Sequence, residues 1–476
     1  MLFFLHLAWG RRPENMQIPH QLSSVSALVP LGNGISSHRG IAFNENLISQ
    51  DNLYFSAMGA TQQSSIHEFV KNESGKKLYS QLNSTSPSDD KSDPVVSIII
   101  ATNNEQDVIE RLLNSIERLT YNRDRFEVIV VDDSTDLTAK ILEDWTKKMK
   151  NLSIIKRKLR IGSKGRALNL ALESLRKDSS WILIIDADTI LPSNIIEQFL
   201  SRSNGSQNDF KAIQGYCIPY NGHLSSNPGF ANWVSRGIEF RLAQRNMIEF
   251  VAKKKLGLPV QITGNLFMIK TSILKQICFS ADICEDWDLT LDLYLRKHDS
   301  EIGGTNILFD ETLNAGNQAP VSLGTYFRQR LRVSEGHTRG FIKKIPTLIL
   351  KEQSLKNKIE IFITGFRYLR YLLFVSLLVL DFIGLALTGT NELSIYLMSS
   401  FAIQFFCLGV FIVAKGLGLV ICKRNMHYTI KFLMSELIVE MCVVPALTLG
   451  SLLAIFRKKG SFHRTQRIGS NARNII

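Results

Sequence analysis

Hydrophobic positions near the start of the folded part of the chain follow two alternating patterns. Residues 95–101 form a short aliphatic run that is typical of a strand buried on both faces of a parallel sheet. A second run of this kind spans residues 126–131. The stretch between them carries apolar residues at helical spacing, namely Val108, Ile109, Leu112, Leu113 and Ile116. The pattern therefore predicts a strand, a helix and a second strand.

The same alternation continues along the chain. It predicts a helix near residues 139–150, a strand at 152–156, a helix around 164–176 and a strand at 181–185. We therefore expect an α/β fold with a doubly wound, mostly parallel sheet. Ligands of such sheets bind outside the carboxyl ends of the strands, so the residues that follow each strand are the candidates for chemistry.

The pattern changes after residue 360, where apolar residues dominate. Three runs lie near 368–388, 393–421 and 430–456, and each is long enough for a spanning helix of about 20 residues. Three buried helices of a soluble domain would all have to lack a polar face, which disfavours that alternative. We therefore expect a region of C-terminal transmembrane helices.

Polarity divides the chain into five segments. Residues 1–92 are rich in Ser, Asn and Gly without sustained periodicity, which indicates a poorly ordered N-terminal extension. The α/β domain is expected at 93–320, interfacial amphipathic helices at 321–365 and the transmembrane region at 366–457. A basic tail at 458–476 completes the chain, and its positive charge favours the cytoplasmic side of a membrane.

Net charge and cysteine content exclude few kinds of ligand or site. The formal net charge of +13 suits nucleic acid, an anionic membrane surface or phosphorylated ligands, and charge alone does not choose among them. The six cysteines include no CxxC pair, so we expect neither a zinc site nor a disulfide framework.

Acidic side chains follow two of the predicted strands. Asp132 and Asp133 come after the strand that ends at residue 131, and Asp186 and Asp188 come after the strand that ends at residue 185. Carboxylates at such strand ends can bind Mg²⁺ or Mn²⁺ and a ribose hydroxyl, because these cations prefer hard oxygen ligands together with phosphate. A single Asp after a strand is commonly just a turn or capping residue, but two ordered clusters favour a nucleotide diphosphate site.

A loop between the acidic clusters adds positive charge. The segment 161–169 contains two glycines and leads into a helix that carries Lys164 and Arg166. Backbone amides and cations in this position could meet phosphate oxygens, although an isolated basic residue at a helix start is usually only solvated. The position of the loop between two acidic strand ends gives it weight.

These residues, in this order, resemble the membrane-bound family 2 glycosyltransferases, relatives of cellulose, hyaluronan and chitin synthases. The resemblance covers roughly residues 94–470 and begins at 97–105, which is similar to the family's first strand and nucleotide-base loop. It implies a GT-A-like catalytic domain in which donor contacts come from Thr102, Glu105, Asp132, Asp133, Lys164 and Asp186. Asp186 and Asp188 match the family's metal-binding DxD motif.

The resemblance also assigns residues on the acceptor side. Thr263, Gly264 and Asn265 look like the family's acceptor loop, and residues 284–289 are similar to its TED motif, with Cys in place of Thr. Glu285 and Asp286 are then the catalytic pair, with Asp286 as the base that takes the acceptor proton during an inverting transfer. Taken alone, the two acids would be read as an acidic first helical turn favoured by the helix dipole.

A last motif lies before the apolar runs. Residues 329–333 match the family's QxxRW signature except that Val333 replaces Trp, so Gln329 and Arg332 remain as expected donor contacts. Asn103 stands where family members often have Tyr, which leaves the contact with the base of the donor open. Val also offers a sugar far less flat apolar surface than Trp, so we expect short products or single additions.

The resemblance implies an inverting hexosyltransferase that uses a nucleotide-sugar donor, taken as UDP-linked, with Mg²⁺ or Mn²⁺. Its acceptor would be a glycan or a lipid-linked molecule, and its catalytic domain would be cytoplasmic in a multi-pass protein of the cell membrane; no nucleic acid partner is expected. Transfer of one sugar to polyprenyl phosphate is an alternative. A membrane transporter or binding protein is a distant one, which would use the acids within the apolar runs, Asp381, Glu436 and Glu440.

Overall fold

The computed structural model describes most of the chain after residue 92. The described residues are 93–157, 163–204, 210–219, 230–295, 307–320, 322–387 and 398–456, the last range with gaps at 405, 407–408, 411–412 and 414–425. The N-terminal extension expected at 1–92 and the basic tail expected at 458–476 lie outside the described residues.

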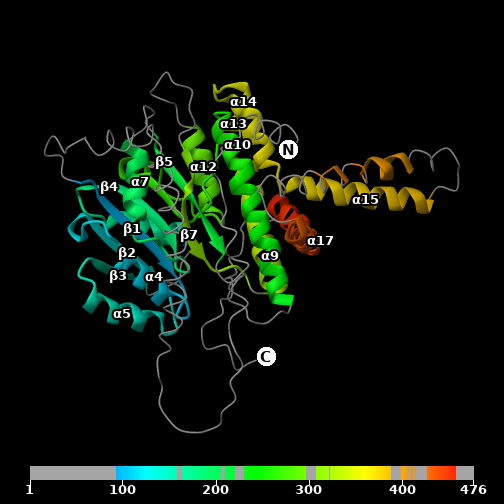
Figure 1. Ribbon diagram of the computed structural model, residues 1–476. Helices are drawn as coiled ribbons and strands as arrows, with labels where there is room; N and C mark the ends of the chain where they lie inside the picture. Colours follow the sequence, from blue (N-terminus) through cyan, green and yellow to red (C-terminus); the bar gives the residue numbers. More distant parts are fainter. Residues whose placement is uncertain are drawn as a thin grey trace, which may run out of the picture. The chain divides into compact units, whose positions relative to one another are not determined.

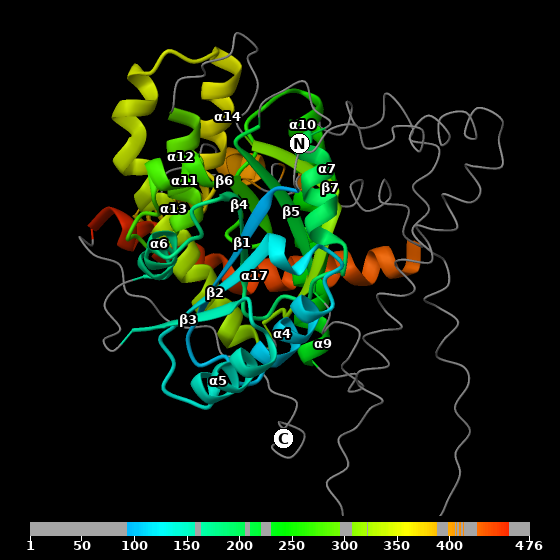
Figure 2. The same cartoon turned by 90° about the vertical axis from the view of Figure 1, so that its left-hand side faces the viewer.

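The described chain forms a seven-stranded sheet in the order β3-β2-β1-β4-β6-β5-β7. Figure 2 shows the strands from β3 at one edge toward β7 at the other. Neighbouring strands pair in parallel except around β6, which is antiparallel to both β4 and β5. The prediction of a mostly parallel α/β sheet is therefore confirmed. The strands are β1 (Val95–Thr102), β2 (Phe126–Asp132), β3 (Leu152–Lys156), β4 (Ser179–Asp186), β5 (Ala212–Pro219), β6 (Phe267–Lys270) and β7 (Ile307–Asn317).

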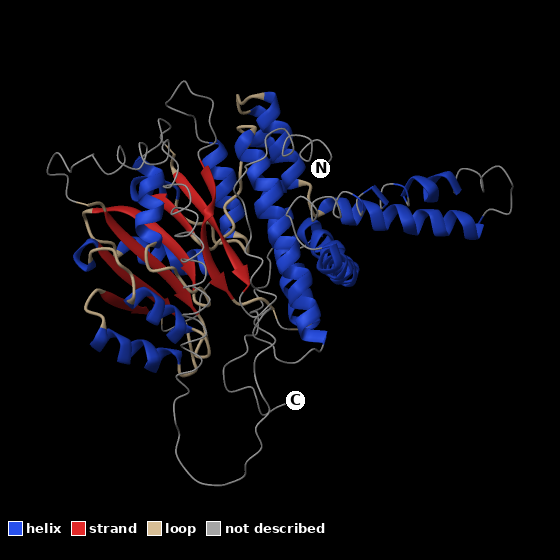
Figure 3. Cartoon of the chain, in the orientation of Figure 1, coloured by secondary structure: helices blue, strands red, loops and turns tan. Residues whose placement is uncertain are grey.

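Helices cover both faces of this sheet (Figure 3). Successive side chains of the buried strands point to opposite faces, so Ile98 and Ile100 enter one apolar core whereas Ile99 enters the other. The first core is completed by α4 (Ile109–Glu117), α5 (Thr138–Lys148) and α7 (Ile195–Asn204), and the second by α6 (Lys164–Glu173), α11 (Thr271–Ile277) and α12 (Glu285–Leu295). A short 3₁₀ turn, η3 (Arg123–Arg125), precedes β2.

The strand order brings the predicted acidic clusters together. The chain leaves β1 toward β2 and β3 on one side and returns to β4 on the other, so β1 and β4 flank a topological switch point. Register places Thr102 beside Asp132 and Ala101 beside Asp186. The carboxyl ends of three neighbouring strands therefore converge on one edge of the sheet.

A second group of helices packs beside the sheet. It consists of α9 (Phe230–Ala243), the π-helix η4 (Gln244–Phe250), α10 (Val251–Lys255), α13 (Leu323–Leu350), α14 (Leu355–Gly365), α15 (Leu369–Leu387) and α17 (Met426–Phe456). The helix α17 packs against α9, α13 and α15, as Figure 1 shows, and α13 also contacts α12. The contact between α9, α13 and α17 is an apolar cluster that includes Val234, Tyr326 and Val443.

The expected transmembrane region is only partly visible. Among the described residues, one helical segment, Leu433–Phe456, has the length and apolar composition needed to cross a membrane. This segment is partly buried by its neighbours, as a core helix of a soluble protein would also be. The apolar run at 368–388 forms α15, and most of the run at 393–421 lies outside the described residues. Several C-terminal membrane crossings are therefore not confirmed.

Close packing of α17 on α13 yields a testable prediction. A Cβ added at Gly450 would lie 2.6 Å from the backbone oxygen of Leu331 and 2.9 Å from Cβ of Ser334. Gly450→Ala should therefore destabilise the protein by about 1–3 kcal/mol, the usual cost of overpacking. A lower thermal unfolding midpoint in detergent would show this effect. Gly324→Ala is the matched control, because nothing lies within 4 Å of its added Cβ. Equal midpoints for the two variants would contradict the packing.

Candidate active site

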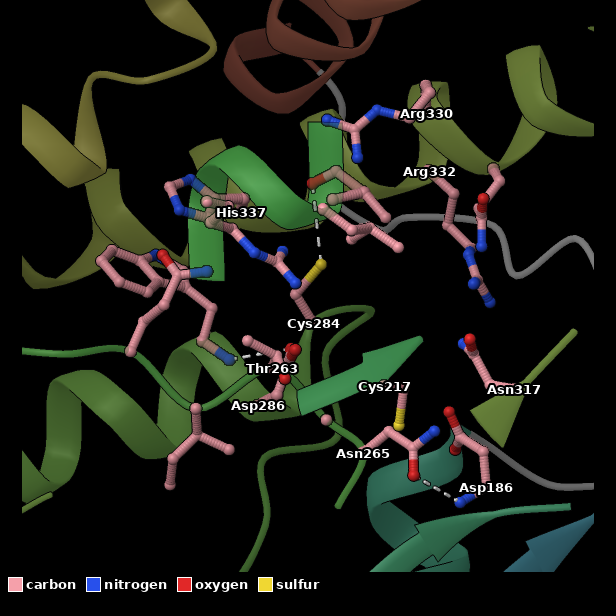
Figure 4. Close-up of a pocket in the computed structure, with 18 of the residues that line it drawn as sticks. Asp186, Cys217, Thr263, Asn265, Cys284, Asp286, Asn317, Arg330, Arg332 and His337 are labelled. Carbon is pink, nitrogen blue, oxygen red and sulfur yellow. Dashed lines mark hydrogen bonds between the residues drawn. The ribbon is translucent and has the colours of Figure 1, made fainter. Parts of the chain in front are cut away.

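One cavity of about 890 Å³ opens at the carboxyl edge of the sheet. It is bounded by the ends of β1 and β4, the first turn of α12, the helix α13 and the π-helix η4. Figure 4 shows lining residues of β4, α12 and α13, among them Asp186, Asp286 and Arg332. Among the residues expected from the sequence to form the site, those that line this cavity are Thr102, Glu105, Asp133, Lys164, Asp186, Asp188, Thr263, Gly264, Asn265, Glu285, Asp286, Gln329 and Arg332. Asp132 is not among its lining residues.

The carboxylates after β2 are held by neighbouring side chains. Asp132 is buried and accepts hydrogen bonds from the Thr102 hydroxyl at 2.9 Å and from the backbone N–H of Ser134 at 3.1 Å. It therefore fixes Thr102 in the cavity wall. Asp133 reaches the cavity and forms an ion pair with Arg157, the residue that follows β3. Direct donor contact by Asp132 stays a prediction.

Lys164 joins three parts of the site. Its Nζ lies 2.5 Å from Oδ1 of Asp186, 2.9 Å from the backbone oxygen of Gly264 and 3.7 Å from Oε1 of Glu285. Burial by itself would lower the pKa of Lys164, but the negative charges of Asp186 and Glu285 outweigh it and raise that pKa. The ammonium group therefore stays charged and links the end of β4 to the start of α12.

Asn265 shapes the turn that carries the two DxD carboxylates. Its Oδ1 accepts a hydrogen bond of 3.0 Å from the backbone N–H of Asp186, and its Nδ2 donates to the Thr189 hydroxyl at 3.1 Å. Asp188 is buried and accepts a 3.2 Å hydrogen bond from the backbone N–H of Gln318. Asn265 thus has a visible role in positioning the turn, and its expected contact with the acceptor stays a prediction.

Glu285 and Asp286 begin α12 and face the cavity. Burial raises the pKa of Glu285 to about 7, although Lys164 opposes the shift. Burial also raises the pKa of Asp286, against a 2.8 Å hydrogen bond that the Trp287 backbone N–H donates to its Oδ1. Gly264 has a φ of +78°, and a Cβ there would lie 3.0 Å from Oδ2 of Asp286. The acceptor loop therefore passes directly beside the expected base.

The site fits a divalent cation only together with a ligand. Within the described ranges, no group of three or more His, Cys, Asp and Glu side chains is placed to hold a metal. Asp186 and Asp188 supply two carboxylates on one turn, and Mg²⁺ often uses one or two carboxylates plus phosphate oxygens and water. The donor set is therefore compatible with a cation that binds along with a diphosphate.

An aromatic stack lies where the sequence lacks the signature Trp. Val333 lines the cavity and packs against the apolar cluster of α9, α13 and α17. One turn later on α13, His337 stacks on Trp287 with ring centroids 4.2 Å apart and contacts Tyr368 edge-on at 5.0 Å. Rings from three elements therefore line the part of the cavity next to Asp286.

Several lining residues were not predicted from the sequence. Arg157 could have been noticed as a basic residue directly after a strand. His337 carried no such signal. Trp287 lies within the TED-like segment 284–289, but its contact with His337 depends on how α12 packs against α13. Arg245 and Arg367 come from the π-helix and from the turn after α14, which share no sequence motif with the strand ends.

Comparison with known proteins identifies the domain that carries this site. The model of the family described as Glycosyl transferase family 2 matches residues 97–272. The chain contains a family 2 glycosyltransferase domain. This match spans β1 to the start of α11 and includes Asp186, Asp188 and the acceptor loop. Relatives of the chain include a beta-glucosyltransferase and a beta-monoglucosyldiacylglycerol synthase.

Two relatives of the glycosyltransferase domain illustrate its range. Over 214 residues the chain is 27% identical to a poly(ribitol-phosphate) beta-glucosyltransferase from Bacillus spizizenii. This alignment covers 43% of this chain and 33% of the relative. Over 253 residues the chain is 34% identical to a beta-monoglucosyldiacylglycerol synthase from Nostoc. This alignment covers 51% of this chain and 49% of the relative. The chain thus spans between about a third and a half of these two relatives' lengths.

A solved structure supports the fold of the glycosyltransferase domain. The mannosyltransferase PcManGT from Pyrobaculum calidifontis, in complex with GDP-Man and Mn²⁺, aligns with a TM-score of 0.52 at 17% identity. The alignment covers 85% of this chain and all of the mannosyltransferase. The GT-A-like architecture expected from the sequence is therefore confirmed, and at this identity the likeness concerns the fold alone.

The carboxylate pair predicts a pH dependence. If Asp286 must be ionised to act, kcat/KM should rise with pH, and the acid limb should lie above the range of an exposed Asp because burial raises the pKa of Asp286. Lys164→Gln removes the cation that lowers the pKa values of both Glu285 and Asp286, so the limb should move to higher pH. Lys140→Gln on the surface of α5 is the control. A limb that stays in place or moves to lower pH in Lys164→Gln would exclude this coupling.

Proposed function

We propose that this chain is an inverting glycosyltransferase that moves a sugar from a UDP-linked donor to a glycan or lipid acceptor at a membrane. One observation carries the proposal: Asp186, Asp188, Lys164 and Asp286, which come from separate motifs, line a single cavity at the carboxyl edge of the sheet. The match to the glycosyltransferase family supports it. Metal-dependent turnover of a nucleotide sugar by the purified chain is the direct test.

The donor would lie along the strand ends. Thr102 and Asp133 line the cavity near the end of β1 and suit contacts with the nucleoside, whereas Lys164, Gln329 and Arg332 suit the diphosphate. A divalent cation held by Asp186, Asp188 and the diphosphate would neutralise charge on the leaving group. Lys164 already contacts Asp186, so this residue couples donor binding to the carboxylates of α12.

The transfer would occur in one step at Asp286. Its carboxylate takes the proton of the acceptor hydroxyl as that oxygen attacks the anomeric carbon, and the bond to the diphosphate breaks on the opposite side. No covalent intermediate is required, and the configuration of the sugar inverts. Glu285, with a pKa near 7, would orient Lys164 and limit the negative charge beside the base.

The acceptor is proposed to be membrane-proximal. Relatives named monoglucosyldiacylglycerol synthases favour a lipid, while the poly(ribitol-phosphate) relative favours a glycan as the second candidate. The structure adds an exposed apolar stripe on α14, formed by Leu355, Ile359 and Ile363, which suits an interfacial helix. Together with the candidate span in α17, this stripe supports a membrane location. A cytoplasmic catalytic domain is part of the proposal and rests on the positive charge of the C-terminal tail.

A transporter finds less support. Asp381 accepts hydrogen bonds from Ser400 and Gln404, and Glu440 accepts one from Tyr371 and pairs with Arg241 at 3.7 Å. Two of the acids considered for an ion path, Glu436 and Glu440, line the same cavity as Asp286. They therefore outline no separate path within the described residues.

The role of Asp286 as base leads to a prediction for its amide variant. Asp286→Asn keeps the shape of the side chain but cannot accept the proton, so turnover should fall by at least about 10²-fold. The KM for the donor should change little, because the loss is in the chemical step. Steady-state assays with labelled nucleotide sugar measure both. Asp292→Asn, on the same helix and paired with Lys344, is the matched control. Transfer by Asp286→Asn at the control's rate would remove Asp286 from this role.

The DxD pair leads to a separate prediction about metal. Asp188→Asn should abolish transfer and weaken Mn²⁺-dependent binding of UDP, because one of two carboxylate ligands is lost. Titration calorimetry with UDP, with and without Mn²⁺, measures the effect without turnover. Asp178→Asn, an exposed site that pairs with Arg176, serves as the control. Unchanged metal-dependent affinity for UDP in Asp188→Asn would show that the cation site is elsewhere.

A further inference from the structure

The cavity continues beyond Asp286 into a compartment that the proposed donor site does not use. We define this arginine compartment by Arg245 of η4, Arg330 and His337 of α13, and Arg367 and Tyr368 of the turn after α14. All five residues line the cavity. Figure 4 shows Arg330 and His337 at one end of the drawn site and Asp186 at the other.

The cations of this compartment exceed its carboxylates. Arg367 pairs with Glu249 at 2.5 Å, and Glu249 also pairs with Lys253 at 2.7 Å. Glu249 is also the carboxylate that acts on Arg245, and among the described residues no ion pair joins a carboxylate to Arg330. The Nε of each of these two arginines is buried without a hydrogen-bond partner. Burial and the charge of Arg367 lower the pKa of Arg245 to about 10. Arg245, Arg367 and Lys253 therefore share the negative charge of Glu249, and Arg330 has no carboxylate of its own among the described residues.

Neighbouring polar groups in the compartment also lack hydrogen-bond acceptors. Arg330 donates a 2.9 Å hydrogen bond to the Tyr368 hydroxyl, and the ring of Tyr368 packs against His337. Both ring nitrogens of His337 are buried and have no partner among the described residues. Burial holds the pKa of His337 well below its usual value, so the ring is neutral and offers one N–H donor. The compartment thus presents several unused donors.

A phosphate group would satisfy these donors. Burying unpaired cations costs free energy, and phosphate offers negative charge and several acceptor oxygens to arginines on different elements. The compartment also lies on the acceptor side of the site. His337 stacks on Trp287, which follows the expected base Asp286, whereas Lys164 and Asp186 lie at the strand ends where the donor would bind.

We propose that the arginine compartment holds a phosphate of the acceptor while a separate hydroxyl of that acceptor reaches Asp286. The acceptor is then a polyol phosphate, in which a hydroxyl lies a few bonds from a phosphate. Polyprenyl phosphate does not fit, since its phosphate oxygen would itself be the nucleophile and would have to sit beside Asp286. This inference rests on the proposed function and names the substrate class of that site.

The bonds balance without a further reactant. The acceptor hydroxyl oxygen bonds to the anomeric carbon, its proton passes to Asp286, and the bond from that carbon to the diphosphate breaks. The electron pair of that bond leaves with the nucleoside diphosphate. The acceptor phosphate stays intact throughout and serves only for binding.

One assay can distinguish a polyol phosphate in a lipid headgroup from a free, soluble polyol phosphate. The full chain is placed in phosphatidylcholine vesicles that contain phosphatidylglycerol, diacylglycerol or polyprenyl phosphate, or is given soluble glycerol 3-phosphate. A panel of labelled nucleotide sugars supplies the donor. We expect sugar on phosphatidylglycerol if the polyol phosphate belongs to a lipid headgroup, and on glycerol 3-phosphate if a free one suffices. Transfer only to diacylglycerol or polyprenyl phosphate would overturn the proposal.

Charge-removing variants test the compartment itself. Arg245→Gln and Arg330→Gln should each raise the acceptor KM by about 10-fold or more, the loss expected for a hydrogen bond between charged groups, and raise the donor KM much less. Arg245→Lys should recover part of the affinity. Arg123→Gln removes the same charge from the exposed turn η3 and is the control. A larger change in donor KM than in acceptor KM would assign the arginines to the donor diphosphate and overturn the proposal.

A binding measurement removes the dependence on turnover. Calorimetry with glycerol 3-phosphate and the UDP-bound chain should show binding that weakens about 10-fold in Arg245→Gln, with unchanged melting temperature as evidence of folding. No binding of glycerol 3-phosphate to the unaltered chain, together with no transfer to phosphatidylglycerol, would overturn the assignment. Absence of turnover with every nucleotide sugar would instead reject the proposed function, so the two failures are distinguishable.

Discussion

The arrangement of the site depends on one buried cation. Lys164 lies between Asp186 at the end of β4 and Glu285 at the start of α12, and it also donates to the Gly264 backbone oxygen. Without this ammonium group, the carboxylates of Asp186, Glu285 and Asp286 would share a poorly solvated cavity. Their mutual repulsion would favour protonation of some of them or separate the elements that carry them. The same contact joins two motifs that lie about a hundred residues apart in the chain. Positioning of the DxD turn and ionisation of Asp286 are therefore parts of one electrostatic balance.

Close backbone approach makes that balance possible. A Cβ at Gly165 would lie 2.1 Å from the backbone oxygen of Ser280, so α6 can bring Lys164 to α12 only because this position lacks a side chain. Gly264, with a positive φ, brings the acceptor loop against Asp286. Asn265 then holds the turn after β4 through its amide. These contacts fix the carboxylates before any ligand arrives, which is the preorganisation that a transfer through a charged transition state requires.

The helices beside the sheet give the cavity a basic region in addition to the acidic region at the strand ends. At the strand ends, carboxylates outnumber cations and suit a metal with a diphosphate. Toward η4 and α13, cations outnumber carboxylates, since Arg245 and Arg367 share Glu249 and the Nε atoms of Arg245 and Arg330 have no hydrogen-bond partner among the described residues. A ligand that satisfies both ends has to bring positive charge to one and negative charge to the other. Asp286 lies where the two regions meet, and this position suits a base that acts between donor and acceptor.

The sequence by itself determined the α/β class, the first four strands and the acidic residues that follow two of them, because strands buried on both faces leave aliphatic runs and charged residues follow where such a run ends. Strands β5, β6 and β7 were not predicted. Motif resemblance added Asp286 and the QxxRW-like segment. Only the tertiary structure decided that Asp132 holds Thr102 rather than lining the cavity, that Lys164 bridges Asp186 and Glu285, and that arginines of η4 and α13 face one compartment. Such contacts depend on how helices distant in sequence pack against each other, and local periodicity carries no record of that packing.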